Sequence, residues 1–275
     1  MAIIITDSTC DLTIEQADAM NIEMLSLKVI FDDQSYDDKR TITSEEFYQR
    51  LKASKKLPTT SQVSINQYVE AYQKYPDEDI VVLTLPQQLS GTYQSAIIAL
   101  EQVERDNIYI YDTGTLSVGL AMLIKQAVKM RDQGKSGLEI LNEIKKLAAR
   151  IKIYAVMDTL LYLVKGGRLS SMQGALGSIF SLKPVLTVEN GALSTLARVR
   201  GFDKGMQTIV DIIKTKDNLD PAMPVGFAHS MNPKKLQKLK EMVNPKIVDG
   251  EYILGSVLGT HAGPGAVIVA FFDKE

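Results

Sequence analysis

The chain has 275 residues, of which 45% are hydrophobic and 23% charged, so it is long enough for one large domain or two ordinary ones and too apolar for intrinsic disorder. Its formal charge of −2 provides no general attraction to nucleic acid or to an anionic membrane. No apolar run approaches the roughly 20 residues of a membrane-spanning helix. The single cysteine, Cys10, allows neither an intrachain disulfide nor a cysteine-rich metal site. The N-terminus has a carboxylate at Asp7 and no basic leader, so we expect a cytoplasmic protein.

Short β-rich runs alternate with longer helical patterns through the first half of the chain. The predicted strands are 2–6, 24–30, 79–85, 107–111 and 152–157. The run 80–83 is continuously apolar, which is typical of a strand covered on both faces. Capping-box patterns at Thr43 and Ser64 begin two helices, and 118–130 predicts a well-buried helix. This alternation predicts a Rossmann-like α/β domain over 1–155, with a mostly parallel sheet.

The pattern changes after about residue 155. Two β-rich runs flank Asn190-Gly191, a dipeptide typical of a tight hairpin turn. Further strands and helices alternate beyond this hairpin, the strands at 224–229, 252–256 and 266–272 and the helices at 202–215 and 233–243. A hairpin followed by this alternation predicts a second, α+β domain over 156–275, with a mixed or antiparallel sheet.

Four polar clusters lie at strand ends or helix starts, where ligands of open α/β sheets gather. They are 6–11, 58–64, 87–93 and 259–265. In the first, Asp7, Ser8 or Thr9 is expected to cap the helix that begins near Thr13, or else to line a ligand crevice. This cluster has no glycine with which the backbone would wrap a phosphate.

The second and third clusters place hydroxyl groups just ahead of predicted helices. Free N–H groups and the helix dipole favour an anion at such a position. Two helix starts that converge on one crevice would hold a carboxylate without any net charge on the protein. Ser90 in the third cluster is equally well interpreted as a plain N-cap.

The fourth cluster surrounds His261 with three glycines and a proline, which predicts a tightly shaped loop with a close backbone approach. This setting favours a functional role for His261. Arginines occur in two further places. Arg168 follows a helix that ends on glycine, whereas Arg198 and Arg200 share one face of an extended segment. They are either solvated surface charges or a basic patch for phosphate, carboxylate or an acidic partner.

Several enzyme classes are disfavoured. Gln88 occupies the place where a serine-hydrolase nucleophile elbow has glycine, although Ser90, His261 and either Asp7 or Asp112 can still meet in space. The chain lacks a P-loop sequence, and its two histidines have no carboxylate cluster around them for a catalytic zinc. A hydrolase or acyltransferase that uses Ser90 and His261 therefore stays open as the alternative function.

Taken together, the motifs resemble the DegV family of bacterial fatty-acid-binding proteins, which serve as FakB subunits of fatty acid kinase. The resemblance spans 3–271. It rests on Ile-Thr-Asp-Ser-Thr-Cys-Asp-Leu at 5–12, Pro-Thr-Thr-Ser-Gln at 58–62, Leu-Ser-Gly-Thr-Tyr-Gln-Ser-Ala at 89–96, Gly-Gly-Arg at 166–168 and Gly-Thr-His-Ala-Gly-Pro-Gly at 259–265. One departure is Val63, where the family often has proline.

The resemblance implies a non-enzymatic lipid carrier whose two domains hold one long-chain fatty acid between them, with no cofactor and no metal. The positions implied for the carboxylate are Thr60, Ser90, Ser61, Gly91 and His261. The positions implied for docking a separate kinase subunit are Arg168, Arg200 and Arg198. That subunit would supply ATP and phosphorylate the bound fatty acid to an acyl phosphate for phospholipid synthesis.

Two finer expectations concern the lipid. A partly protonated His261 would adjust how strongly the carboxylate is neutralised. Aliphatic and methionine side chains would line the tunnel for the tail, although ordinary core packing explains each candidate equally well. The candidates are Val118, Met122, Ile179 and Phe180.

Overall fold

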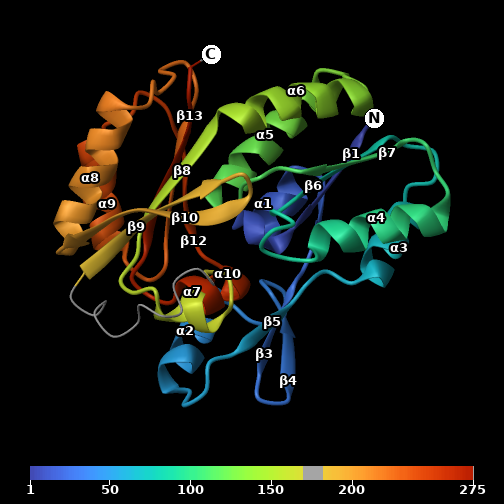
Figure 1. Cartoon of the computed structure of the whole chain (residues 1–275). Helices are drawn as coiled ribbons and strands as arrows, with labels where there is room; N and C mark the ends of the chain where they lie inside the picture. The colour runs from blue at the N-terminus through green and yellow to red at the C-terminus, as the bar shows by residue number, and fades with distance from the viewer. Residues whose placement is uncertain (170–181, 275) are drawn as a thin grey trace.

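The computed structural model describes residues 1–169 and 182–274, and these form two main sheets and one small sheet (Figure 1). The first sheet is parallel throughout and has the order β2-β1-β6-β7. Its strands are β1 (Ile3–Asp7), β2 (Ile22–Leu25), β6 (Ile80–Thr84) and β7 (Ile108–Asp112). The central strand β6 is buried along its whole length, as its continuously apolar sequence predicts.

The second sheet has six strands in the order β10-β9-β8-β13-β11-β12. Its strands are β8 (Ile151–Val156), β9 (Leu182–Glu189), β10 (Ala192–Arg200), β11 (Val225–His229), β12 (Val248–Ile253) and β13 (Val267–Phe272). Only β11 and β12 pair in parallel, so the sheet is mixed. Positive φ angles at Asn190 and Gly191 form the predicted turn between β9 and β10. The mixed α/β fold class is thus confirmed, whereas the division at residue 155 stays a prediction.

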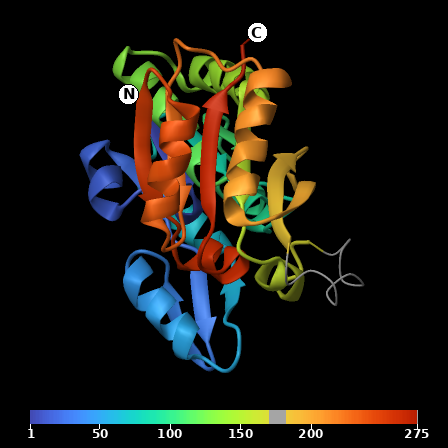
Figure 2. The ribbon, with the colours of Figure 1, turned by 90° about the vertical axis from the view of Figure 1, so that its left-hand side faces the viewer.

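Helices cover both faces of the parallel sheet. On one face lie α3 (Ile65–Gln73) and α4 (Thr92–Val103), and on the other α5 (Val118–Asp132) and α6 (Gly137–Arg150). The short α1 (Ile14–Ala19) follows the 3-10 turn η1 (Ser8–Cys10). In the other half, α8 (Phe202–Thr215) and α9 (Pro233–Val243) cover the outer face of the six-stranded sheet (Figure 2). The capping boxes predicted at Thr43 and Ser64 are present.

A small third sheet was not predicted. It pairs β3 (Lys28–Phe31) with β4 (Gln34–Asp37) and β5 (Thr59–Ser61), next to α2 (Ser44–Ala53). The sequence predicts one strand over 24–30, but the chain leaves the first sheet at Ser26, whose hydroxyl donates to the Asp38 carbonyl. At the next residue, the Leu27 N–H donates to the Ser8 hydroxyl instead of to a strand.

Helix α5 packs against both main sheets and joins their cores. Val118 and Met122 meet β11 at Gly226, where a β-carbon would lie 2.3 Å from Val118 Cγ2 and 2.9 Å from Met122 Sδ. Both side chains are fully buried in this contact. The prediction that Val118 and Met122 line a lipid tunnel is therefore wrong, because they fill the space between helix and sheet. The other two candidates, Ile179 and Phe180, lie outside the described residues.

No helix within residues 1–169 and 182–274 has both the length and the apolar character needed to cross a membrane. Over the same residues, no group of three or more His, Cys, Asp or Glu side chains is arranged to hold a metal ion.

The contact at Gly226 generates a prediction about stability. Gly226→Ala should lower the free energy of unfolding by about 1–3 kcal/mol, because the new methyl group overpacks a filled interface. Denaturant unfolding followed by circular dichroism measures the change. The added methyl group meets Val118 Cγ2 first. The double variant Gly226→Ala/Val118→Ala should therefore lose less free energy of unfolding than the two single variants lose together. Additive effects would contradict the contact.

Candidate functional site

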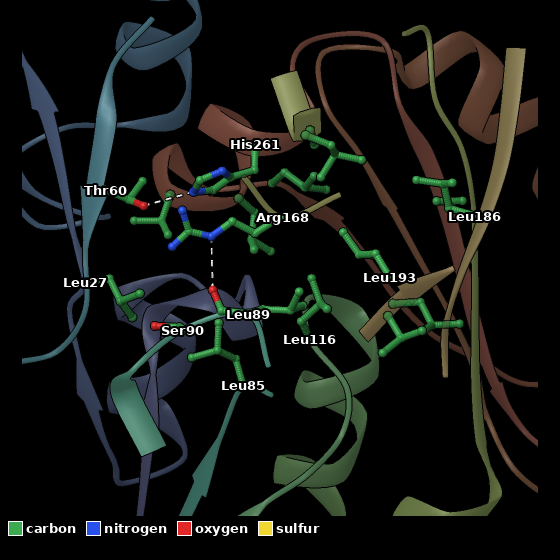
Figure 3. A pocket seen from close by; sticks show the side chains of 18 of the residues that line it. Leu27, Thr60, Leu85, Leu89, Ser90, Leu116, Arg168, Leu186, Leu193 and His261 are labelled. Carbon is green, nitrogen blue, oxygen red and sulfur yellow. Dashed lines mark hydrogen bonds between the residues drawn. The ribbon is translucent and has the colours of Figure 1, made fainter. Parts of the chain in front are cut away.

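A cavity of about 320 Å³ lies between the inner face of the six-stranded sheet and the end of β6. Its body is apolar and is lined from β8, β9 and β10 by side chains such as Ala155, Leu186 and Leu193. Polar side chains gather at its other end, beside β5 and α10 (Ser256–Ala262) (Figure 3). The cavity thus has a polar head and an apolar body, and its volume is within the usual range for a small-molecule site.

Thr60 and His261 form a hydrogen-bonded pair at the polar end. Thr60 lies on β5, opposite Val29 of β3, and His261 lies in the last turn of α10. Thr60 Oγ1 and His261 Nε2 are 2.9 Å apart. His261 Nδ1 is buried without a hydrogen-bond partner, next to Gly166, whose β-carbon would lie only 2.3 Å from it. Glycine at 166 therefore lets the ring pack against α7 (Leu161–Lys165).

His261 is neutral at physiological pH. Burial, with the nearby Arg168 charge as a second cause, lowers the pKa of His261 to about 4. The expectation of a partly protonated His261 is therefore wrong, because the ring is buried and also lies near the Arg168 charge. A neutral imidazole can donate one hydrogen bond and accept another, but it supplies no positive charge to a ligand.

Ser90 and Gly91 lie at the start of α4, facing the same cavity. Ser90 Oγ lies 3.0 Å from Thr92 Oγ1 and accepts from the Thr92 N–H at 3.3 Å. Gly91 is the N-cap and offers no side-chain cap. A β-carbon there would lie 2.1 Å from Gln62 Oε1, so the β5 loop packs closely on this helix start.

The five residues predicted for the carboxylate all line this one cavity: Thr60, Ser61, Ser90, Gly91 and His261. Only Ser90 and Gly91 are at a helix start, however. Thr60 and Ser61 are on β5, and α3 begins later, after the N-cap Ser64. A strand thus positions the hydroxyl groups of Thr60 and Ser61, and a helix start positions the Ser90 hydroxyl and the Gly91 backbone.

Arg168 also lines the cavity, although the family resemblance implied for it only a role in docking. Its Nε donates to the Leu89 carbonyl at 3.1 Å (Figure 3). Its Nη1 donates to the Gly166 carbonyl at 2.7 Å. Burial lowers the pKa of this half-buried guanidinium, which nevertheless stays charged. Among the described lining residues it is the one that carries a charge at neutral pH.

The other two arginines lie elsewhere. Arg198 and Arg200 are exposed on β10, the edge strand of the six-stranded sheet, where they are paired with Pro184 and Leu182. Two residues apart on one strand, they share a face, as the sequence predicts.

The first polar cluster has a structural role. Asp7 accepts from the Thr9 N–H as N-cap of η1 and from the Leu85 N–H at 2.8 Å. Burial raises the pKa of Asp7 to about 6. Helix α1 is capped by Thr13 itself. The prediction that Asp7, Ser8 or Thr9 caps this helix is therefore wrong, and Asp7 instead caps η1.

The geometry does not form a serine–histidine pair. Ser90 Oγ is engaged with Thr92, and His261 Nε2 is engaged with Thr60. His261 Nδ1 has no partner, so no carboxylate orients the ring as in a Ser-His-Asp triad.

The whole chain matches proteins of one family. The family model described as "Uncharacterised protein, DegV family" matches residues 1–274. A DegV domain-containing protein of Caldanaerobacter subterraneus is 33% identical and covers 98% of each chain. A DegV lipid-binding protein from Thermotoga maritima is 28% identical with a TM-score of 0.87, covering 100% of this chain and 99% of its own. A DegV family protein from Thermus thermophilus, described by its fatty acid binding, is 27% identical with a TM-score of 0.88. The match covers 98% of this chain and 99% of the Thermus protein.

The setting of His261 predicts how it titrates. Its imidazole ¹⁵N shifts should remain those of a neutral ring until the pH falls to about 4, because burial and Arg168 disfavour the cation. An unfolded histidine is protonated near pH 6.5. The lowered pKa of His261 therefore contributes to the free energy of unfolding above pH 6.5, and this contribution is lost as the pH falls from there to about 4. In Arg168→Met the His261 pKa should rise, and protonation of wild-type His261 near pH 6.5 would contradict this setting.

Proposed function

Because this chain belongs to the DegV family over residues 1–274, we propose that it binds one long-chain fatty acid in the cavity between its two main sheets. The observation that carries the proposal is the division of this cavity into a polar end and an apolar body. The lipid-binding and fatty-acid-binding relatives from Thermotoga maritima and Thermus thermophilus support it.

The energetics favour such a ligand. Each methylene group contributes about 0.8 kcal/mol when it leaves water for an apolar chamber. A long acyl chain thereby offsets the cost of desolvating one carboxylate, provided that the carboxylate is hydrogen-bonded. The polar end of this cavity offers hydroxyl donors and the start of α4 for that purpose.

We assign the carboxylate to the hydroxyls of Thr60, Ser61 and Ser90 and to the backbone of Gly91, with His261 next to Thr60. Arg168 would supply the opposing charge from the cavity wall. Burial lowers the pKa of Arg168, and an anion close by would offset the cost of burying this charge.

We further propose that the protein is a cytoplasmic carrier with no chemistry of its own, which presents its lipid to a separate kinase. A carboxylate oxygen would take the γ-phosphoryl group of the kinase's ATP and release ADP, forming an acyl phosphate for phospholipid synthesis. The exposed pair Arg198 and Arg200 supports docking of an acidic partner surface. Arg168 remains a docking candidate, with the cavity contact as its second role.

Removal of the head-group hydroxyls tests the lipid site. Thr60→Val and Ser90→Ala should each weaken binding of palmitate about tenfold or more, because each removes a hydrogen bond to a charged group. Native mass spectrometry of protein incubated with palmitate measures the bound fraction. Thr59→Val is the matched control, since Thr59 is exposed on the same strand. Unchanged retention in both variants would refute the assignment of the head group.

The alternative function is tested on the same samples. A serine-reactive fluorophosphonate should leave wild-type protein unlabelled, since Ser90 has no histidine paired with it. Stable labelling at Ser90 would instead favour a hydrolase or acyltransferase.

The arginines should separate lipid binding from transfer. Arg200→Ala should leave palmitate bound but slow its phosphorylation by a partner kinase, and the wild-type rate should fall with rising salt. Arg168→Met should weaken both, because its guanidinium faces the cavity. Acyl phosphate trapped as the hydroxamate measures transfer, and Lys129→Ala, an exposed change on α5, is the control. Loss of lipid from Arg200→Ala would move Arg200 from docking to the fold or the lipid site.

A further inference from the structure

A second, polar cleft of about 630 Å³ adjoins the apolar end of the cavity. It is lined by the end of β7, the start of β8 and the turn between β9 and β10, including Asp112, Lys152 and Glu189. Two residues line both spaces, Ile153 and Val188. This pair, which we call the partition, is therefore the wall between an apolar chamber and a polar cleft.

The partition belongs to two neighbouring strands. Tyr154 of β8 pairs with Thr187 of β9, and the Thr187 hydroxyl donates to the Ile153 carbonyl at 2.9 Å. Ile153 and Val188 are thus the next residues outward on their strands. Because side chains alternate along a strand, they share the inner face with Ala155 and Leu186, which line the chamber.

The partition is also at the far end from the polar residues. Met157 packs with Leu163 and Leu169 beside Arg168, so the chamber runs along β8 from Met157 to Ile153. The four residues from Met157 to Ile153 span about 13 Å along the extended chain. At its end the β9–β10 turn is held in place by the facing loop, since a β-carbon on Gly191 would lie 3.3 Å from Pro86 Cβ.

We propose that Ile153 and Val188 set the length of acyl chain that the chamber accepts, and that the polar cleft receives the methyl end of a longer chain once the partition is trimmed. This inference rests on the proposed function. Each methylene group buried in the chamber raises affinity about fourfold. A methylene group among the charged and amide groups of the cleft gains little. Affinity therefore rises with chain length up to the partition and falls beyond it, because a longer chain would overlap the partition side chains.

Changes at Val188 test the partition. An equimolar series of saturated even-numbered fatty acids, from laurate to behenate, is offered to each variant and the bound masses are read by native mass spectrometry. Val188→Ala should move the most strongly bound acid at least one member up the series, with about a fourfold gain for that member over wild type. Val188→Phe should move it at least one member down.

The matched control is Val185→Ala, which removes the same atoms from the same strand but from the opposite, fully buried face that packs against α8. It should leave the chain profile unchanged. If wild-type protein retains lipid and neither Val188 variant moves the profile, the partition is refuted while the proposed function stands. If wild-type protein retains no member of the series, the proposed function fails and this inference fails with it.

Discussion

One helix, α5, has to pack against two sheets at once, and the rest of the architecture depends on that double contact. Val118 and Met122 reach β11 only because Gly226 has no side chain. Where α5 lies between the sheets, its buried side chains pack with those of both sheets in one hydrophobic cluster. Beyond its N-terminal end, where Leu116 precedes it, the two sheets enclose the cavity. The chamber is therefore a gap that the spacing of the sheets creates and that no helix of residues 1–169 and 182–274 fills.

The polar end of this chamber combines neutral hydrogen-bonding groups with the charge of Arg168. The Thr60–His261 pair and the start of α4 provide hydrogen bonds, while Arg168 is held by two carbonyls from α7 and the β6–α4 loop. A bound carboxylate would thus be fixed by several neutral groups rather than by a tight ion pair. Such an arrangement leaves its oxygens nucleophilic, which a carrier that hands its lipid to a kinase requires.

The sequence predicted local structure well, and it predicted the site by its clusters. The apolar run of β6, the Asn190-Gly191 turn and the helices at 202–215 and 233–243 agree with the structure, because each depends on nearby residues alone. The convergence of Thr60, Ser90 and His261 followed from the resemblance to a family. The small sheet was missed because β4 and β5 are short and polar and because β5 pairs with β3 from a distant part of the sequence. The place of Arg168 in the cavity wall was also missed, since a loop that follows a helix can point in many directions.

Arg168 has a consequence for how the proposed lipid would leave. Its guanidinium is half-buried and faces a space in which the described residues supply no acidic side chain. If the fatty acid departs alone, this cation is left without its counter-ion in a partly dry site, which is costly. If another fatty acid enters as the first one leaves, or if the head group becomes an acyl phosphate before departure, the negative charge is never removed from the site. The electrostatics of the wall therefore favour exchange of one anion for another over simple release.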